Sequence, residues 1–448
     1  MKITILNGNP DGQDMEFEGY LERLEKELAA GQHQVTLLNL REMDLRYCVG
    51  CFGCWVKTPG ECITPDDGAQ VCRAVINSDF TLWASPLRMG FPSALLKKTM
   101  DKTIGLIHPY FVVDHNEAHH RARYAHYPRL GLLLGKEAGT DAEDIRIVTD
   151  IFARTALNMK SRLYFSLQTD QPVEQAAAAI NIALQGGGSK NTGELFEKRP
   201  RPTQGVQVPS PARLTVFNGS PRGSKGNTPL LLDQFLKGFT SLPGKSYEVV
   251  HLNHIKQAGS FVEAYARAEC VLLGFPLYTD GMPGIVKAFI EQLEPFQTRK
   301  VSNQTLRVFE TLRVYSPPPP IGFFVQSGFP EAAHSRHVEH YLEKLARRLG
   351  SPYLGTIVKG GCEGIRLMPP NMTARLFESF YQIGRVFGET GRFDPTLLHN
   401  LAKPERYSPL LAPVFKIFAR LPVASFYWDG MLKENGAYER RFAHPYDG

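Results

Sequence analysis

The chain has 448 residues, of which 43% are hydrophobic, 21% are charged and 10% are aromatic. This length and composition exclude a disordered or fibrous protein and predict more than one globular core. The 51 Lys and Arg residues only slightly outnumber the 45 Asp and Glu residues, and they form no basic runs. The charge therefore argues against a nucleic-acid partner.

Neither end of the sequence predicts export or membrane insertion. The N-terminal apolar run, Ile3–Leu6, is too short for a signal peptide. The stretch Leu410–Trp428 is interrupted by Lys416, Arg420 and prolines, so we expect no membrane span. Seven cysteines, an odd number without an export signal, predict reduced thiols or metal ligands in a cytoplasmic protein.

Two parts of the chain resemble each other. The run I-T-I-L-N that ends at Asn7 is followed by Gly-Asn-Pro, and L-T-V-F-N ending at Asn218 is followed by Gly-Ser-Pro. Further on, Ser-Pro-Leu from Ser85 recurs as Phe-Pro-Leu from Phe275. We therefore expect two diverged copies of one domain, the first of which carries additional residues that include a cysteine segment.

In each copy, short apolar runs alternate with longer segments of helical period, which is typical of a parallel α/β sheet. In the first copy we expect strands near residues 3–7, 34–40, 80–85, 129–134 and 162–166, and helices near 17–30, 67–76, 93–107 and 142–158. In the second copy we expect strands near 214–218, 247–252, 270–275, 322–326 and 353–358, and helices near 228–239, 261–268, 283–295, 331–349 and 373–389. The predicted fold class is α/β, with two tandem flavodoxin-like doubly wound parallel-sheet domains.

The domain boundaries follow from changes in composition. We expect residues 1–185 to form the first domain and residues 212–402 the second. Residues 186–211, rich in Gly, Pro and Arg, predict a linker. Residues 403–448 are rich in Pro and aromatic residues and predict a tail that packs on a domain or on a partner. His115, His119, His120 and His126 lie in a polar loop with Asp114 and Glu117, which predicts a solvated surface, with a metal site as the alternative.

The strongest local motif runs from Asn218 to Thr228, between the first strand and the first helix of the second copy. Its glycines let the backbone approach an anion, and the helix N-terminus adds positive partial charge. Ser220 and Thr228 offer hydroxyl donors, and Arg222 supplies a cation. The spacing differs from the P-loop and from the dinucleotide fingerprint, so the motif predicts a phosphate site of another kind, with a plain glycine-rich turn as the alternative.

A second motif, Phe275–Pro283, follows the third strand of the same copy. An aromatic, apolar and glycine-containing loop suits a flat heteroaromatic ring. Because neighbouring parallel strands end at one edge of the sheet, we expect this loop and the phosphate loop to hold opposite ends of one ligand. The alternative is a packed turn before a helix.

With the segment Gln326–Glu331, these loops resemble the NAD(P)H-dependent FMN reductase family of flavodoxin-like proteins. In the first copy the resemblance lies in Asn7–Asp11, Ser85–Pro92 and the cysteine segment. It implies that Ser220, Arg222, Asn227 and Thr228 hold the phosphate of FMN. It also implies that the isoalloxazine is lined by Pro276, Leu277, Tyr278, Thr279, Asp280, Gly281, Ser327 and Gly328.

The first copy departs from this pattern. Its loop carries Asp11, Asp14 and Glu16 where the second copy has basic and hydroxyl side chains. Because carboxylates repel a phosphate dianion, we expect about one FMN per chain, held by the second domain.

Four of the seven cysteines lie in one short segment, at Cys48, Cys51, Cys54 and Cys62. Thiolates at this spacing can converge on an iron–sulfur cluster or on zinc. The segment resembles that of the iron-sulfur flavoproteins, whose cysteines bind a [4Fe-4S] cluster. Three alternatives stay open: a cluster, zinc, or thiols without a metal.

The resemblance implies an oxidoreductase that passes electrons from NAD(P)H through FMN to a small-molecule acceptor, such as a quinone, nitro or azo compound. No side chain needs to act as acid or base in hydride transfer to flavin, so we predict no catalytic residue. The alternatives are an electron carrier of the iron-sulfur flavoprotein type and a non-enzymatic redox or partner-binding protein. The family also implies that the two halves pair as an intramolecular pseudo-dimer, alone or within a homo-oligomer.

Overall fold

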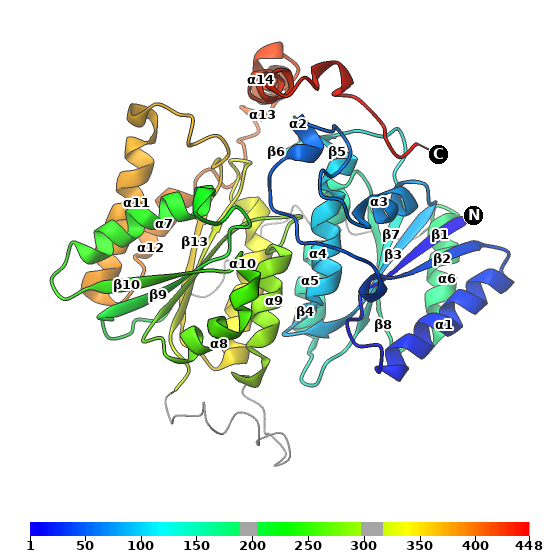
Figure 1. Cartoon of the computed structure of the whole chain (residues 1–448), viewed down its shortest axis with the longest axis horizontal. Helices are drawn as coiled ribbons and strands as arrows, with labels where there is room; N and C mark the ends of the chain where they lie inside the picture. Colours follow the sequence, from blue (N-terminus) through cyan, green and yellow to red (C-terminus); the bar gives the residue numbers. More distant parts are fainter. Residues whose placement is uncertain (188–203, 297–316, 448) are drawn as a thin grey trace. The chain divides into compact units, whose positions relative to one another are not determined.

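The computed structural model describes residues 1–187, 204–296 and 317–447, which form two compact units (Figure 1). Unit 1 contains the described residues of Met1–Arg199, Tyr278–Gly284 and Arg406–Gly448. Unit 2 contains those of Pro200–Leu277 and Ile285–Glu405. Unit 1 is thus completed by a short loop and a C-terminal segment from the second half of the sequence.

Unit 1 is built on a parallel sheet with the strand order β2-β1-β3-β7-β8. Its parallel strands are β1 (Lys2–Asn7), β2 (Gln34–Asn39), β3 (Phe80–Arg88), β7 (Arg129–Gly135) and β8 (Leu163–Gln168). The short strand β4 (Phe91–Pro92) turns back antiparallel to β3. Its helices are α1 (Met15–Ala30), α2 (Gly53–Val56), α3 (Gly68–Ile76), α4 (Ala94–Met100), α5 (Ala142–Asn158) and α6 (Val173–Leu184).

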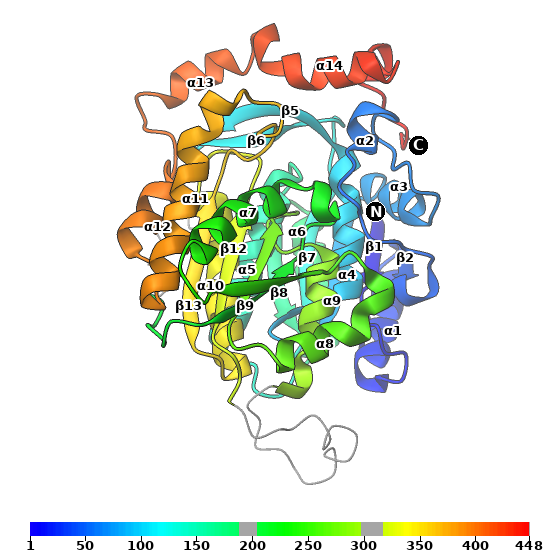
Figure 2. The same ribbon diagram turned by 60° about the vertical axis from the view of Figure 1, so that its left-hand side comes forward.

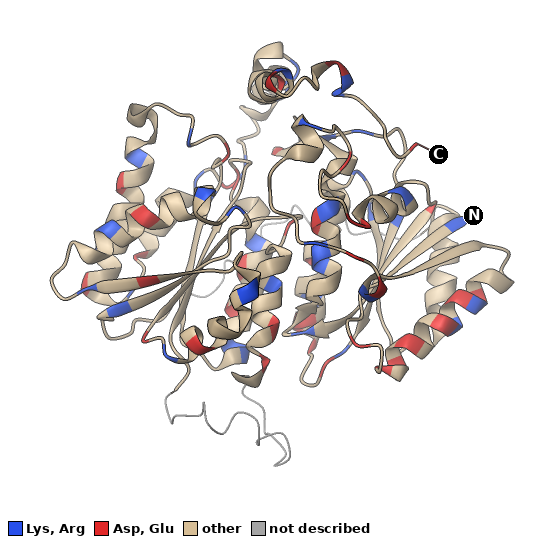
Figure 3. Ribbon diagram, viewed as in Figure 1, with Lys and Arg blue, Asp and Glu red and all other residues tan. Residues whose placement is uncertain are grey.

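The core of unit 1 follows from the amphipathic period of its helices. Leu21, Leu24 and Leu28 recur on one face of α1 and pack with Ile180 of α6 against the buried side chain of Leu82 in β3. The opposite face of α1 carries interspersed acidic and basic residues (Figure 3).

A hairpin stands where the sequence predicted a solvated loop. Strands β5 (Ile107–Asp114) and β6 (Glu117–Ala122) pair antiparallel, and Glu117 and His119 are buried. Arg154 of α5 lies 2.8 Å from the Glu117 carboxylate, and Asn158 hydrogen-bonds to the His119 ring at 2.7 Å. The prediction is wrong for His119, which is buried, and holds for His115 and His126, which are exposed. Partners distant in the sequence pair with Glu117 and His119, which makes their burial tolerable.

The C-terminal segment packs on unit 1. Helices α13 (Ala412–Phe418) and α14 (Phe426–Glu434) lie beside the β5–β6 hairpin in both views (Figures 1 and 2). The Tyr407 N–H donates to the Asn116 carbonyl at the hairpin turn at 2.9 Å. Of the alternatives left open by the sequence, the structure therefore shows packing on a domain.

Unit 2 repeats the same topology, with the strand order β10-β9-β11-β12-β13 and all pairs parallel. The strands are β9 (Arg213–Asn218), β10 (Ser246–His251), β11 (Val271–Pro276), β12 (Ile321–Gln326) and β13 (Tyr353–Lys359). The helices are α7 (Asn227–Thr240), α8 (Ala258–Ala266), α9 (Gly284–Gln292), α10 (Ala333–Leu349), α11 (Pro370–Thr390) and α12 (Pro395–Ala402). In both sheets the order is that of a flavodoxin-like doubly wound fold, so the predicted fold class is confirmed.

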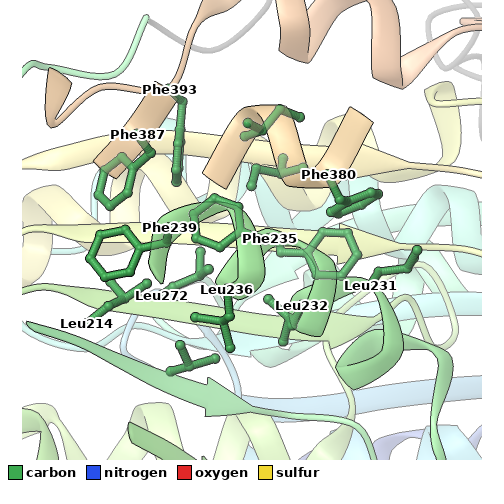
Figure 4. Close-up of a cluster of buried hydrophobic side chains, with 14 of the residues drawn as sticks. Leu214, Leu231, Leu232, Phe235, Leu236, Phe239, Leu272, Phe380, Phe387 and Phe393 are labelled. Atoms are coloured by element: carbon green, nitrogen blue, oxygen red, sulfur yellow. The ribbon is translucent and has the colours of Figure 1, made fainter. Parts of the chain in front are cut away.

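Aromatic side chains dominate one core of unit 2 (Figure 4). Phe235 and Phe239 of α7 meet Phe387 of α11 above the sheet. The two helix backbones are so close that a Cβ at Gly238 or at Gly384 would lie 1.9 Å from a carbonyl oxygen of the other helix. Glycine is therefore required at both positions.

Most of the predicted linker, residues 188–203, lies outside the described residues. Its last part joins unit 2: the Val206 N–H donates to the Tyr353 carbonyl at 2.8 Å. Among the helices that the structure describes, none has the length and apolar character required to cross a bilayer.

Candidate functional site

Three loops of unit 2 meet at the carboxyl edge of its sheet. The Asn227 side-chain amide at the start of α7 donates to the Cys362 carbonyl at 2.7 Å. The Cys362 N–H donates to the Ser327 carbonyl at 2.9 Å, and the Ser327 N–H donates to the Lys359 carbonyl at 3.0 Å. The loops after β9, β12 and β13 are thereby tied into one wall at the edge where doubly wound folds bind ligands.

The predicted phosphate loop forms a close backbone cradle. Ser220 and Thr228 are buried, and the Ser220 N–H is fixed by Asn218 Oδ1 at 3.1 Å. Gly223 has a φ of +58°, and a Cβ at Gly226 would lie 2.1 Å from the Ser220 hydroxyl. Among the described residues, no side chain caps the N-terminus of α7. The uncapped first-turn N–H groups of α7 thus follow directly on two buried hydroxyls, and the close approach of Ser220 requires glycine at position 226; this arrangement suits a phosphate monoester.

Two side chains that the sequence analysis missed lie beside this loop. Glu363 approaches Arg222 to 3.9 Å, and the Arg222 side chain is 26% exposed. Arg366 donates to the carbonyls of Ser224 and Gly226. Both belong to the loop after β13, so no local pattern near the phosphate motif could have indicated them. The positive charge of Arg222 is partly offset by a carboxylate until an anionic ligand competes for it.

Gln326, at the end of β12, is a further polar group at this edge. Its side-chain amide lies 3.4 Å from the Thr228 hydroxyl, and the Leu277 N–H donates to its carbonyl at 2.7 Å. It connects the phosphate loop to the start of the predicted ring-side loop. Of the predicted ring-lining residues, those that belong to unit 2 are Pro276, Leu277, Ser327 and Gly328.

The other predicted ring-lining residues, Tyr278–Gly281, group with unit 1. Tyr278 and Gly281 exchange two backbone hydrogen bonds of 2.9 Å, and the two residues between them are left-handed, with φ of +41° at Thr279 and +58° at Asp280. This is the backbone of a tight hairpin turn, and it is strained at a β-branched threonine.

Partners in unit 1 hold this strained turn. Lys97 Nζ donates to the Tyr278 carbonyl at 3.0 Å and to the Thr279 hydroxyl at 2.7 Å. The Asn158 side-chain amide donates to both Asp280 oxygens at 2.8 and 2.9 Å. The side-chain polar atoms of Thr279 and Asp280 are therefore bonded to protein. Only backbone groups of the turn could contact the edge of a ring.

The corresponding loop of unit 1 is filled by the protein's own carboxylates. Asp14 caps α1 by accepting from the Phe17 N–H at 3.1 Å. Glu18 accepts from the side-chain amide of Asn9 at 2.7 Å and from Arg41 at 2.9 Å. Donors that could meet a phosphate are thus already used by the protein itself. That unit 1 does not hold FMN in the same way stays a prediction.

The cysteine segment turns tightly through left-handed Gly50 and Phe52, with φ of +65° and +58°. Burial, followed by the nearby thiols of Cys48, Cys62 and Cys51, holds the pKa of the Cys54 thiol well above its usual range. The four predicted metal ligands, Cys48, Cys51, Cys54 and Cys62, therefore share one neighbourhood.

The thiols have other partners in this structure. Lys102 Nζ lies 3.8 Å from Cys62 Sγ and 2.7 Å from the Asp66 carboxylate. None of the seven cysteines, all of which lie in the described part of the chain, forms a disulfide. Over the described residues, no three His, Cys, Asp or Glu side chains are arranged to hold a metal ion. The donor chemistry fits iron or zinc, but this arrangement does not close a metal site.

The C-terminal segment covers the cysteine segment, which sequence analysis did not indicate. Trp428 of α14 packs against Phe52 and Trp55 at ring distances of 5.1 and 5.2 Å. Cys54 and Leu432 belong to the same apolar cluster. A Cβ at Gly60 would lie 2.5 Å from the Pro445 ring, so the chain after α14 also lies directly on this segment.

Comparison with known proteins matches residues 1–123 to the family described as NADPH-dependent FMN reductase. The predicted family resemblance is confirmed for this part of the chain. An iron-sulfur flavoprotein of Archaeoglobus fulgidus is 24% identical over 103 residues, which are 23% of this chain and 49% of that protein. The chain thus spans about half the length of this curated relative.

Two solved structures illustrate the structural matches. The Trp repressor binding protein from Bacillus subtilis is 19% identical with a TM-score of 0.29, over 38% of this chain and 96% of that one. An FMN-dependent NADH-azoreductase from Bacillus anthracis, in complex with FMN, is 10% identical with a TM-score of 0.28, over 39% and 99% of the two chains.

Proposed function

We propose that this chain is an FMN-containing oxidoreductase that takes electrons from NAD(P)H and passes them to a small acceptor such as a quinone, nitro or azo compound. The observation that carries the proposal is the phosphate cradle of unit 2, with buried Ser220 and Thr228 at the uncapped start of α7. The family match of residues 1–123 supports the same chemistry.

The chain's own residues bind and orient the cofactor. Ser220, Thr228 and the first-turn N–H groups of α7 donate to the phosphate, and Arg222 neutralises part of its charge. The Asn227 amide is already bonded to Cys362, so its role is to fix the loop. When bound, FMN supplies the two-electron chemistry between the nicotinamide and the acceptor.

A double variant tests the site. Arg222→Ala with Thr228→Val should give a folded, colourless protein without NAD(P)H oxidation. Arg213→Ala with Thr240→Val, two positions of unit 2 outside the loop, should stay yellow and active. Full flavin content in the double variant would contradict the proposal, as would release of two FMN per chain by the native protein.

We further propose that the two halves pair as an intramolecular pseudo-dimer. The support is the loop Tyr278–Gly284, which lies in the second half of the sequence but groups with unit 1. Expressed alone from Pro209 onwards, the second domain lacks Lys97 and Asn158, which hold this loop. It should then bind FMN weakly or aggregate. A monomeric fragment with undiminished FMN affinity would contradict the pairing.

A second candidate is an electron carrier of the iron-sulfur flavoprotein type, favoured by the shared neighbourhood of the four clustered thiols and by the Archaeoglobus fulgidus relative. Anaerobically purified protein should then contain about four irons and four acid-labile sulfides. Cys54→Ala should lose them and keep FMN, whereas Cys270→Ala should keep both. Stoichiometric zinc would indicate a structural site instead, and protein without flavin or metal would favour a non-enzymatic binding role.

A further inference from the structure

The segment between Arg406 and α14 presents an apolar surface that the rest of unit 1 does not cover. Eight large hydrophobic side chains between 38% and 87% exposed form this apolar platform: Leu410, Leu411, Val414, Ile417, Phe418, Leu421, Val423 and Phe426. They lie within one short stretch of sequence, so the platform is contiguous along the chain.

The platform includes the outer side of α13 and the residues just before and after this helix, whose inner side is already packed. Ala412 is buried, and the Phe415 ring stacks on Tyr407 at 4.4 Å. Val414 and Ile417 recur at helical spacing on the side that stays exposed. Apart from Lys416 the residues of α13 are apolar, and none of the described residues covers its outer face.

Both ends of the platform are fixed to unit 1. At its start Arg406 pairs with the buried Glu117 carboxylate. At its end the Tyr110 hydroxyl donates to Asp429 at 2.7 Å, and Trp428 packs on Trp55. These contacts hold the apolar side chains outward. Replacing the apolar side chains would leave the contacts of Arg406, Asp429 and Trp428 intact.

Within the platform segment the charge has one sign. No Asp or Glu occurs between Arg406 and Trp428, while Lys416 and Arg420 lie four residues apart. In the described parts of the chain neither cation has an ion-pair partner. Apolar side chains flanked by Lys and Arg, with aromatic residues at one end, are typical of segments that lie in the interface of an anionic membrane. A symmetric contact with a second copy would instead bring the same cations together.

We propose that this apolar platform docks unit 1 peripherally on an anionic lipid surface, with the platform in the interfacial layer and Lys416 and Arg420 at the headgroups. The inference goes beyond the proposed redox function and does not depend on bound FMN. It requires no membrane-spanning element.

Flotation of the full-length protein with vesicles tests the docking. The probe is phosphatidylcholine vesicles with and without phosphatidylglycerol. Binding should require phosphatidylglycerol and weaken at high salt. Lys416→Glu with Arg420→Glu should weaken binding by at least about fivefold per residue, whereas Lys26→Glu with Lys256→Glu, at other exposed positions, lowers the same net charge and should have little effect.

A second comparison separates apolar insertion from charge alone. Leu410→Ser with Ile417→Ser and Phe426→Ser should reduce binding at least about tenfold, since each side chain removes buried apolar area from the interface. Leu367→Ser with Met372→Ser, at exposed positions of unit 2, is the matched control. Absence of vesicle binding, or equal loss in variants and controls, would overturn the proposal. A further outcome would also overturn the proposal: the native chain binds no lipid but self-associates, and the triple variant abolishes this self-association. The platform would then be a protein interface.

Discussion

The carboxylate of Glu18 accepts a 2.7 Å hydrogen bond from the side-chain amide of Asn9, in the loop of unit 1 that follows its first strand. In unit 2 the loop at the same place in the topology has two buried hydroxyls, and among the described residues no side chain caps the helix that follows it. The loop of unit 1 is thus bonded to an internal carboxylate, whereas the loop of unit 2 is the one for which we propose an external anion.

Replacing Glu18 by Ala should destabilise unit 1. Asn9 is fully buried, and loss of its acceptor leaves a donor unsatisfied, at a cost of about 1–3 kcal/mol. Urea unfolding should report this decrease in the free energy of unfolding. Glu22→Ala, on the exposed face of the same helix, should change it by less than about 0.5 kcal/mol. Equal effects would show that Glu18 has no such role.

Glu363→Gln should tighten FMN binding by about two- to fivefold, the range expected of a partly exposed charge pair. The carboxylate lies 3.9 Å from Arg222, so its removal frees the cation and ends repulsion of the phosphate. Quenching of flavin fluorescence on titration into apo-protein measures the affinity. Glu378→Gln on the exposed side of α11 should leave it unchanged, and weaker binding after Glu363→Gln would contradict the prediction.

Trp428→Ala should expose the cysteine segment. The indole packs on Phe52 and Trp55, and a loss of about 1.4 kcal/mol of local stability makes opening tenfold more frequent. In metal-free protein, Cys54 should therefore react with iodoacetamide roughly tenfold faster, as followed by peptide mass spectrometry. Cys270, buried in unit 2, is the internal reference, and Phe426→Ala is the control variant. An unchanged rate at Cys54 would show that α14 does not protect it.

Unit 1 should lose stability in mild acid. Burial, followed by Arg123 and Arg121, lowers the pKa of His108 from 6.5 to about 3. Between these values the unfolded chain binds a proton that the folded chain does not, so stability falls as pH decreases below about 6.5, by up to ~1.4 kcal/mol per pH unit.

Unfolding by urea at neutral pH and near pH 5 measures this slope. His108→Phe should reduce it, because a neutral ring then lies between Tyr110 and Phe442, which are 5.8 and 5.3 Å from the imidazole. The slope that remains belongs in part to His120, whose pKa burial also lowers to about 3. His126→Gln, at an exposed position, should leave the slope as it is. If the variant His108→Phe keeps the full slope, the acid sensitivity comes from other groups and the prediction is wrong.

Asp101→Ala should destabilise the protein by about 3–5 kcal/mol, because it leaves the Lys97 ammonium buried without its counter-ion. Both side chains of this pair are at most 2% exposed. The exposed pair Lys136–Asp170, at 2.7 Å, offers the matched comparison: Asp170→Ala should cost about 0–1 kcal/mol. Similar losses in the two variants would show that burial does not set the strength of the pair.

The sequence by itself determined the alternation of strands and helices and the phosphate motif. Strands β11 and β12 lie within a residue of their predicted positions, because a buried parallel strand is a continuous apolar run that neighbouring residues define. The helix predicted over 93–107 was less accurate: α4 ends at Met100, and a 3-10 segment continues to Leu106. The Asn218–Thr228 loop was visible for the same local reason, since glycines and hydroxyls adjacent in sequence form its cradle.

Only the tertiary structure decided which polar groups are buried and what they meet. In the sequence Glu117 belongs to a segment that we expected to be solvated. In the structure it is buried, because Arg154 and Arg406, from two distant segments, pair with its carboxylate. Likewise Glu363 reaches Arg222 from the loop after β13, and Trp428 of α14 packs in the same apolar cluster as Cys54. Whether a charge or a thiol can be buried depends on the partners that enclose it. The folding of the whole chain brings these partners together, so the residues beside the group in the sequence do not identify them.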